Sequence, residues 1–256
     1  MASLRVIVTR PAREAVRWTA DLRAAGIEAV ALPLIEIAAV EDPAPLSAAW
    51  QQCGRYRALM FVSAAAVDHF FALSDGASLH GARGWATGPG TAAALRRAGV
   101  ADAAIDVPPA DAAQFDSEAL WSHVQRQIVP GAEVLVVRGG DAQGRPAGRD
   151  WLSDRVEAAG GRCSRVVAYR RLPPDFDDAQ RHLARGASAP PAVWLFSSAE
   201  AIGNLGRAMP DISWAEARAV ATHPRIVQAA LDAGFGTVLP SRTGLSDVVA
   251  SIESLR

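Results

Sequence analysis

The sequence predicts an α/β protein that contains two similar parallel-sheet domains produced by an internal duplication. Three observations predict this fold class: short β-rich runs alternate with longer apolar-periodic segments, the 256-residue length suits two domains, and the two halves of the chain resemble each other. Hydrophobic residues make up 50% of the chain and charged residues 21%, a balance that is typical of globular proteins.

The first predicted strand and helix come from the opening of the chain. Leu4 to Val8 is a β-rich run, and Arg13 to Ala25 carries apolar residues at helical spacing before Gly26, a helix-terminating residue. Further strands are predicted at Ala29–Leu32, Ala58–Val62, Val134–Val137, Arg165–Tyr169, Val193–Phe196 and Ala217–Ala221. Helices are expected to follow most of these strands.

Internal similarity supports the duplication. Ser63 and the residues around it align with Ser198 and its neighbours, 135 residues later, and Gly88 to Thr91 aligns with His223 to Ile226 at the same offset. This repeat is far longer than the roughly 20–50 residues of solenoid repeats, so it predicts two domains that face each other. The proline-rich segments Asp42–Pro45 and Leu172–Asp175 are the expected junctions, and the cleft between the domains is the expected ligand site.

Hydroxyl-bearing residues are expected to begin helices at the carboxyl ends of the strands. Helix N-termini favour anions, and α/β sheets bind ligands at this edge. The glycines of Gly88-Pro89-Gly90-Thr91 permit a close backbone approach to a ligand. Simple helix capping is the alternative interpretation of these hydroxyls. The residues are Thr9, Ser63, Thr91, Ser117, Ser198 and Ser246.

Two arginines occupy matching places after the first strand of each half. Arg10 and Arg138 would suit a substrate that carries several carboxylates, because a guanidinium binds a carboxylate with two parallel hydrogen bonds. The alternative is that both are solvated surface arginines.

Composition excludes several classes of chemistry. All 26 basic residues are arginine, and the absence of lysine excludes Schiff-base chemistry, pyridoxal phosphate attachment and a Walker-type phosphate loop. The five histidines lack HxxxH and HxH spacing, and two cysteines cannot form a tetrahedral cysteine site or a disulfide framework, so no metal is expected. A net charge of −1 gives no indication of a nucleic-acid partner.

The apolar runs fall short of the roughly 20 residues that cross a bilayer, so no membrane span is expected. The N-terminus lacks the pattern of a secretory signal, and the expected compartment is therefore the cytoplasm. No heptad or edge signal demands a partner subunit, which favours a monomer.

Seven short motifs, in order, resemble the uroporphyrinogen-III synthase family and span nearly the whole chain. The motifs are Val6–Pro11, Ala31–Ile37, Phe61–Val67, Gly88–Ala92, Ser117-Glu118, Val134–Gly139 and Val167–Arg171. The resemblance implies two flavodoxin- or Rossmann-like domains, one of residues 1–37 plus 173–256 and the other of residues 40–170. It also implies a two-stranded antiparallel linker near 38–45 and 168–175.

The same resemblance implies a cofactor-independent, cyclising hydro-lyase of porphyrin and haem biosynthesis. Its substrate would be hydroxymethylbilane, a linear tetrapyrrole with multiple carboxylates, which is closed to uroporphyrinogen III with inversion of ring D. Tyr169 matches the family's tyrosine that is thought to help the hydroxyl leave, with a buried structural tyrosine as the alternative. The expected substrate-binding residues are Thr9, Arg10, Ser63, Ala64, Gly88, Gly90, Thr91, Ser117, Arg138, Gly139, Ser197 and Ser198.

His223 and Ile226 depart from the family pattern, in which glycine and threonine are usual at the last strand-to-helix turn. This departure keeps open a non-catalytic tetrapyrrole-binding or regulatory module on the same fold. A two-lobe protein that binds a sugar or an amino acid is a third interpretation, against which the missing signal sequence argues.

Overall fold

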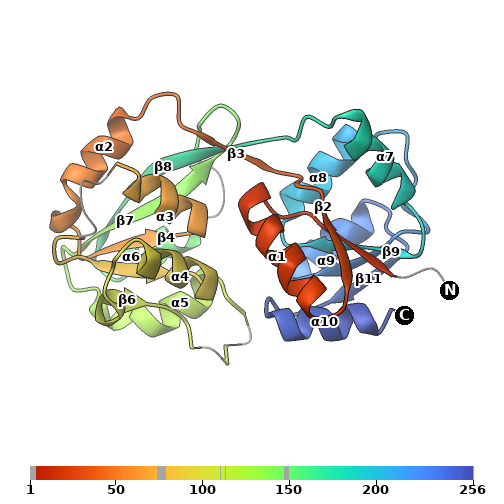
Figure 1. Ribbon diagram of the computed structural model, residues 1–256. Helices are drawn as coiled ribbons and strands as arrows, with labels where there is room; N and C mark the ends of the chain where they lie inside the picture. Colours follow the sequence, from red (N-terminus) through yellow and green to blue (C-terminus); the bar gives the residue numbers. More distant parts are fainter. Residues whose placement is uncertain (1–3, 74–78, 110, 113, 147–149, 256) are drawn as a thin grey trace. The chain divides into compact units, whose positions relative to one another are not determined.

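The computed structural model describes residues 4–73, 79–109, 111–112, 114–146 and 150–255 (Figure 1). The chain divides into two compact units, of which the first comprises the residues up to Glu36 together with those from Leu172 onward. The second unit runs from Ile37 to Arg171. The chain therefore passes between the units twice, at Glu36/Ile37 and at Arg171/Leu172.

The described strands of the first unit form one parallel five-stranded sheet in the order β11-β10-β9-β1-β2. With the strands numbered along the unit and read from the β2 edge, this order is 2-1-3-4-5. It is a doubly wound arrangement in which the chain reverses its winding direction between β1 and β9. The strands are β1 Arg5–Val8, β2 Glu28–Ala31, β9 Ala192–Phe196, β10 Arg218–Ala221 and β11 Thr237–Pro240.

Successive residues of these strands pack into two different cores, as alternation along a strand requires. Val6 and Val8 contact the core layer formed with helices α1 and α10, whereas Trp194 and Phe196 belong to an aromatic cluster that includes Phe235. Because both kinds of position are apolar, the strands read as continuous hydrophobic runs. The helices of this unit are α1 Ala12–Ala24, α7 Asp178–Gly186, α8 Ala199–Ala208, α9 Pro224–Asp232 and α10 Leu245–Glu253.

The described strands of the second unit form a six-stranded sheet in the order β3-β8-β7-β4-β5-β6. The ladder from β8 to β6 is parallel throughout. β3 and β8 are also the strands that lead into and out of the unit. The strands are β3 Glu36–Ala39, β4 Ala58–Phe61, β5 Arg83–Ala86, β6 Ile105–Asp106, β7 Glu133–Gly140 and β8 Arg162–Leu172.

Helices cover both faces of the second sheet. Leu59 and Phe61 pack with helices α2, α3 and α4, whereas Ala58 and Met60 pack with α5 and α6. The α-helices are α2 Ala44–Gln51, α3 Ala64–Phe71, α4 Pro89–Arg97, α5 Ser117–Val124 and α6 Trp151–Ala158. Short 3-10 turns are η1 Cys53–Arg55, η2 Asp102–Ala104 and η3 Gln125–Gln127.

The prediction of a mixed α/β fold with parallel sheets is confirmed. The predicted strands are present with shifted ends: the strand predicted at Val134–Val137, for example, extends over Glu133–Gly140. Strands β5, β6 and β11 were not predicted, and β3, next to β8 in the sheet, begins earlier than the linker strand that the resemblance implied near 38–45. β5 contains Arg83 and Gly84, and β6 has only two residues, so their pairing with neighbouring strands, more than their own propensity, makes them strands.

The segment Asp42–Pro45 begins a helix. The Asp42 carboxylate accepts a hydrogen bond from the Ala44 backbone N–H at 2.9 Å, and Pro43 occupies the N-cap of α2. Proline is well tolerated here because the first N–H groups of a helix have no intrahelical partner.

Candidate functional site

Most of the predicted site residues lie at the carboxyl ends of strands that flank the reversal point of each sheet. In the second unit this point lies between β7 and β4, which end at Gly140 and Phe61. In the first unit it lies between β1 and β9, which end at Val8 and Phe196. Doubly wound sheets bind ligands at this position, where the loops separate in opposite directions.

Tyr169 and Ser63 form a hydroxyl pair in the second unit. The Tyr169 phenol oxygen lies 3.0 Å from Ser63 Oγ, and either atom can be the donor. Ser63 is the N-cap of α3, and its Oγ accepts a hydrogen bond from the Ala66 N–H at 3.1 Å. Tyr169 is only 4% exposed, so the surrounding core holds its ring in place.

A β-bulge directs Tyr169 toward Ser63. Along the β7–β8 ladder Arg138 pairs with Val167, but Gly139 pairs with Tyr169, so Ala168 is the extra residue. As a result Ala168 and Tyr169 both join the core layer of α2, α3 and α4, although adjacent strand residues normally face opposite sides.

Gly139 is required for this arrangement. A Cβ added at Gly139 would lie 2.6 Å from Cζ and 2.8 Å from the oxygen of Tyr169. Both distances are far below van der Waals contact, so the phenol lies directly against the Gly139 backbone. Sequence reasoning treated Gly139 and Tyr169 as separate site residues, and the structure shows them in contact.

The start of α4 is tied to the end of β4 in the same unit, because the Thr87 hydroxyl, just before Gly88, donates to the carbonyl of Val62, just before Ser63, at 3.3 Å. Its N-cap is Gly88, which provides no side-chain cap, and a Cβ added at Gly90 would meet nothing within 4 Å. The backbone at Gly90 therefore faces open space at the positive end of a helix. Thr91 is the third residue of this helix and is 6% exposed.

The prediction that hydroxyls begin the helices is right for Ser63 and Ser198, which are the N-caps of α3 and α8. Ser117 is the first residue of α5, as predicted, but the cap itself is Asp116, whose carboxylate accepts from the Ala119 N–H at 2.9 Å. An aspartate one residue earlier is an equally good cap and carries a charge that suits the helix dipole. Ser198 forms no side-chain cap hydrogen bond.

Three other hydroxyls are also not N-caps. Pro11 is the N-cap of α1, and the buried Thr9 hydroxyl instead donates to the Leu195 carbonyl at 2.6 Å, which ties the end of β1 to β9. Ser246 lies inside α10, after the N-cap Gly244. Thr91 lies inside α4, after the N-cap Gly88. Ala64 is the first residue of α3, and Ser197 directly precedes Ser198 after β9.

Arg10 and Arg138 are both held by an acid that follows them in the chain. Arg10 donates to Glu14 of α1 at 3.1 Å, and Arg138 donates to Asp150, the N-cap of α6, at 2.9 Å. The Arg138 residue is 5% exposed, and the Arg10 side chain is 14% exposed and lies over the ring of Trp18. Neither is a solvated surface arginine.

Burial lowers the pKa of the Arg10 guanidinium, and Glu14 opposes that shift. Arg138 is also separated from the hydroxyl pair. Arg138 lies two and four residues after Val136 and Val134 in β7, so it is on the same face of the strand as these residues, which pack with α5 and α6. Tyr169 packs on the opposite face of the same sheet.

His223 fills the helix start in the first unit that corresponds to Gly88. It is the N-cap of α9, and its Nδ1 accepts from the Arg225 backbone N–H at 3.1 Å. Ile226 is 8% exposed and packs into the protein. One N–H that an anion would otherwise contact is therefore already satisfied.

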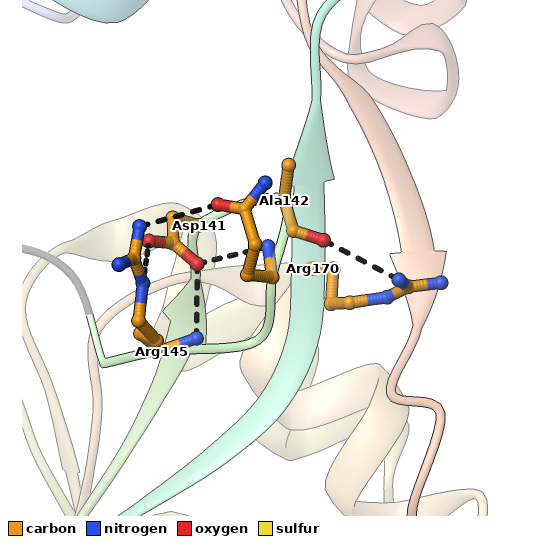
Figure 2. A network of polar contacts seen from close by, with 5 residues as sticks. Asp141, Ala142, Arg145 and Arg170 are labelled. Carbon is orange, nitrogen blue, oxygen red and sulfur yellow. Dashed lines mark hydrogen bonds and ion pairs between the residues drawn. The ribbon is translucent and has the colours of Figure 1, made fainter.

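Sequence reasoning missed the loop that follows β7. Figure 2 shows the Asp141 carboxylate facing Arg145, whose backbone N–H and Nε both donate to it, at 2.9 and 2.8 Å. These bonds, led by the Arg145 N–H, lower the pKa of Asp141. Arg170, next to Tyr169, reaches the Ala142 carbonyl at 3.3 Å and also bonds to Ala39 and Glu41. The loop and the two connecting strands are thus tied by one guanidinium, which no sequence motif predicts.

His69 was also missed. Its ring centroid lies 5.7 Å from that of Tyr169 at an interplanar angle of 30°. Burial lowers the pKa of His69, with Asp68 acting in the opposite direction, so the neutral imidazole is favoured beside the phenol. Its position on α3, six residues after the Ser63 cap, was the only sequence feature that linked it to the site.

Within the described part of the chain, no group of three or more His, Cys, Asp or Glu side chains could hold a metal ion. Over the same residues, no helix is long and apolar enough to cross a membrane.

Comparison with known proteins gives concordant matches. A family profile described as "Uroporphyrinogen-III synthase HemD" matches residues 16–250. A uroporphyrinogen-III synthase of Chlorobaculum parvum is 28% identical over an alignment of 184 residues that covers 69% of this chain and 67% of that protein.

Two solved structures share the fold. One is the uroporphyrinogen-III synthetase of Helicobacter pylori, with a TM-score of 0.59, 14% identity and complete coverage of both chains. The other is a mutant uroporphyrinogen III synthase of Thermus thermophilus, with a TM-score of 0.58, 14% identity and coverage of 99% of this chain and 98% of that one. At this identity the likeness establishes the fold alone.

Proposed function

Because the chain belongs to the uroporphyrinogen-III synthase family, we propose that it cyclises hydroxymethylbilane to uroporphyrinogen III with inversion of ring D. Proteins of this family are cyclising lyases of haem biosynthesis. The observation that carries the proposal for this chain is the Tyr169–Ser63 pair, a hydroxyl pair held at the carboxyl edge of a doubly wound sheet.

The proposed domain organisation is a duplicated pair, residues 1–37 plus 173–256 and residues 40–170, joined by linkers near 38–45 and 168–175. Two features support it. The order β4-α3-β5-α4 in the second unit recurs as β9-α8-β10-α9 in the first. In the sheets, β7 lies next to β4 as β1 lies next to β9. The boundaries of the compact units along the chain fall within β3 and at the end of β8.

In the proposed reaction the terminal hydroxymethyl group loses water and forms an azafulvene cation. Tyr169 donates a proton to the departing hydroxyl, which leaves as water. The substituted carbon of the distal pyrrole attacks the cation and gives a spiro intermediate, which fragments and closes again with ring D inverted. The proton released on closure restores the phenol, so the reaction has no net redox change and consumes no proton.

Binding of the substrate carboxylates is proposed for the helix starts, with the backbone at Gly88, Gly90 and Thr91 as the best-supported contact. Of these residues Gly90 faces open space, whereas Gly88 packs against Phe115 and Thr91 is buried, and no side chain caps this helix start. Ala64, Ser117, Gly139, Ser197 and Ser198 complete the proposed contacts near the strand ends, with Arg10, Thr9 and Arg138 supporting the strand ends and the local charge. Holding the linear tetrapyrrole in the orientation for ring closure contributes most of the rate acceleration, since effective molarity in ring closures is worth roughly 7–11 kcal/mol.

Isomer analysis tests the proposal. Hydroxymethylbilane closes in water to the type I ring, so formation of a porphyrinogen alone has no diagnostic value. A catalyst must bring the substituted carbon to the cation, and a passive tetrapyrrole binder has no reason to impose that choice. Purified protein is expected to yield type III faster than spontaneous closure, and a product that is purely type I at high protein concentration would contradict the proposal.

A further inference from the structure

We propose that Ser63 is a positioning residue that donates its hydroxyl hydrogen to the Tyr169 oxygen and thereby directs the phenol hydrogen toward the leaving hydroxyl. The inference deepens the proposed function and rests on it for the identity of that hydroxyl. It gives Ser63 a role through Tyr169, in place of direct contact with the substrate.

The direction of the Ser63–Tyr169 hydrogen bond decides what the phenol can do. If Tyr169 donates to Ser63, its only hydrogen points away from any substrate and cannot assist the departure of a hydroxyl. If Ser63 donates, the phenol oxygen accepts and its hydrogen is available to a third group. In water a phenol is the stronger donor of the two hydroxyls, so the direction has to come from the surroundings.

The start of α3 supplies that direction. Ser63 Oγ already accepts the Ala66 N–H at 3.1 Å and lies at the positive end of the helix. Both features withdraw electron density from the serine oxygen, which makes it a poorer acceptor and makes its O–H a better donor. A chain of donors follows: Ala66 N–H to Ser63, Ser63 O–H to Tyr169, and Tyr169 O–H to the substrate.

The packing around the phenol keeps the Tyr169 oxygen within hydrogen-bond distance of Ser63. Tyr169 is 4% exposed, the bulge after Arg138 turns its ring toward α3, and the oxygen lies against Gly139. The phenol therefore cannot swing to find another partner without displacing the core. When the proton moves from Tyr169 to the substrate hydroxyl, the phenolate keeps one donor, Ser63, and it is reprotonated by the proton that ring closure releases.

Substitutions at Ser63 test the kinetic consequence. Ser63→Ala removes the donor and is expected to lower kcat about 3- to 10-fold, the size of one net hydrogen bond, with little change in KM. Ser63→Thr keeps both the hydroxyl and the cap and is expected to restore kcat. Asp177→Ala is the matched control, because it removes the cap of α7, where Asp177 accepts from Gln180 at 2.8 Å, outside the proposed site.

Tyrosine Raman bands test the direction of the bond without substrate. The chain has two tyrosines, so Tyr56→Phe leaves Tyr169 as the only source of the tyrosine doublet. The relative intensities of the two bands differ between a phenol oxygen that accepts a hydrogen bond and one that only donates. The expected doublet is that of an acceptor, and Ser63→Ala should shift it toward a phenol without that donor.

The outcomes separate the two proposals. A donor-type doublet, or a doublet that Ser63→Ala leaves unchanged, overturns the role of Ser63 even where type III synthesis is observed. An acceptor-type doublet in a protein that forms only type I supports the hydrogen-bond direction and contradicts the proposed function. A fall in kcat in Ser63→Ala that Asp177→Ala reproduces would show that lost stability, not the donor, is responsible.

Discussion

Gly139→Ala is expected to displace the Tyr169 phenol. The added Cβ would lie 2.6, 2.7 and 2.8 Å from Cζ, Cε2 and the oxygen of Tyr169, whereas ordinary contact begins near 3.4 Å. The ring must therefore move by about 1 Å, and a misplacement of that size costs about 10²-fold in rate. Overpacking of a core also costs about 1–3 kcal/mol of stability.

The assay is kcat for uroporphyrinogen III, measured with the thermal midpoint in three backgrounds. In the Tyr169→Phe background the effect of Gly139→Ala on kcat should disappear, because the proton donor is already gone, but the loss of stability should persist, because phenylalanine keeps the ring. In the Tyr169→Ala background the loss of stability should disappear as well. Gly206→Ala in α8 is the control, since its added Cβ meets nothing within 4 Å. Equal stability costs in all three backgrounds would refute the steric argument.

Three further predictions concern single side chains. Tyr169→Phe is expected to lower kcat by about 10²–10⁴-fold, as loss of a general acid does, with a much smaller change in thermal midpoint; equal rates would return Tyr169 to a packing role. His69→Asn is expected to flatten the pH dependence of stability below about pH 6.5. Burial lowers the pKa of His69, so the unfolded chain binds the proton first and the wild type loses stability as the pH falls, which melting curves at about pH 7 and pH 5 would detect. His223→Gly opens the start of α9 and is expected to lower KM for hydroxymethylbilane about 2- to 5-fold, the worth of a carboxylate near a helix N-terminus; a KM that is unchanged or higher would mean that this helix does not contact substrate.

The arrangement of elements was largely predictable because it depends on local patterns. Strand runs such as Ala58–Phe61 are continuous apolar segments, and Ser63 before an alanine run is a recognisable helix start. Strands such as Ile105–Asp106 were not predictable, because two residues carry no period and the strand exists only through its pairing with β5.

The contacts of the site depend on long-range geometry, which the sequence pattern does not encode. The bulge that turns Tyr169 is a choice of backbone pairing between β7 and β8, and no residue type in Val167–Arg171 marks it. The same holds for Arg138, which is buried and pairs with Asp150 twelve residues later. Arg138 and Tyr169 belong to neighbouring family motifs. Regular alternation from the Arg138–Val167 pair would place both on one face of the sheet, and the bulge places them on opposite faces.

The order β4-α3-β5-α4 of the second unit recurs in the first unit as β9-α8-β10-α9, but the starts of α4 and α9 differ. In the second unit, α4 has Gly88 as its N-cap and Gly90 as its second residue, and Gly90 faces open space at a helix start that no side chain caps. At the corresponding place in the first unit, His223 satisfies an N–H from within the protein. The hydroxyl pair, the bulge and Gly139 also belong to the second unit, whose described residues therefore combine an open helix start with the proposed proton donor. Under the proposed function, the His223 cap takes one N–H that a substrate carboxylate would contact and leaves the Tyr169–Ser63 pair unaltered, so His223 and Ile226 argue for weaker substrate binding and not for lost activity.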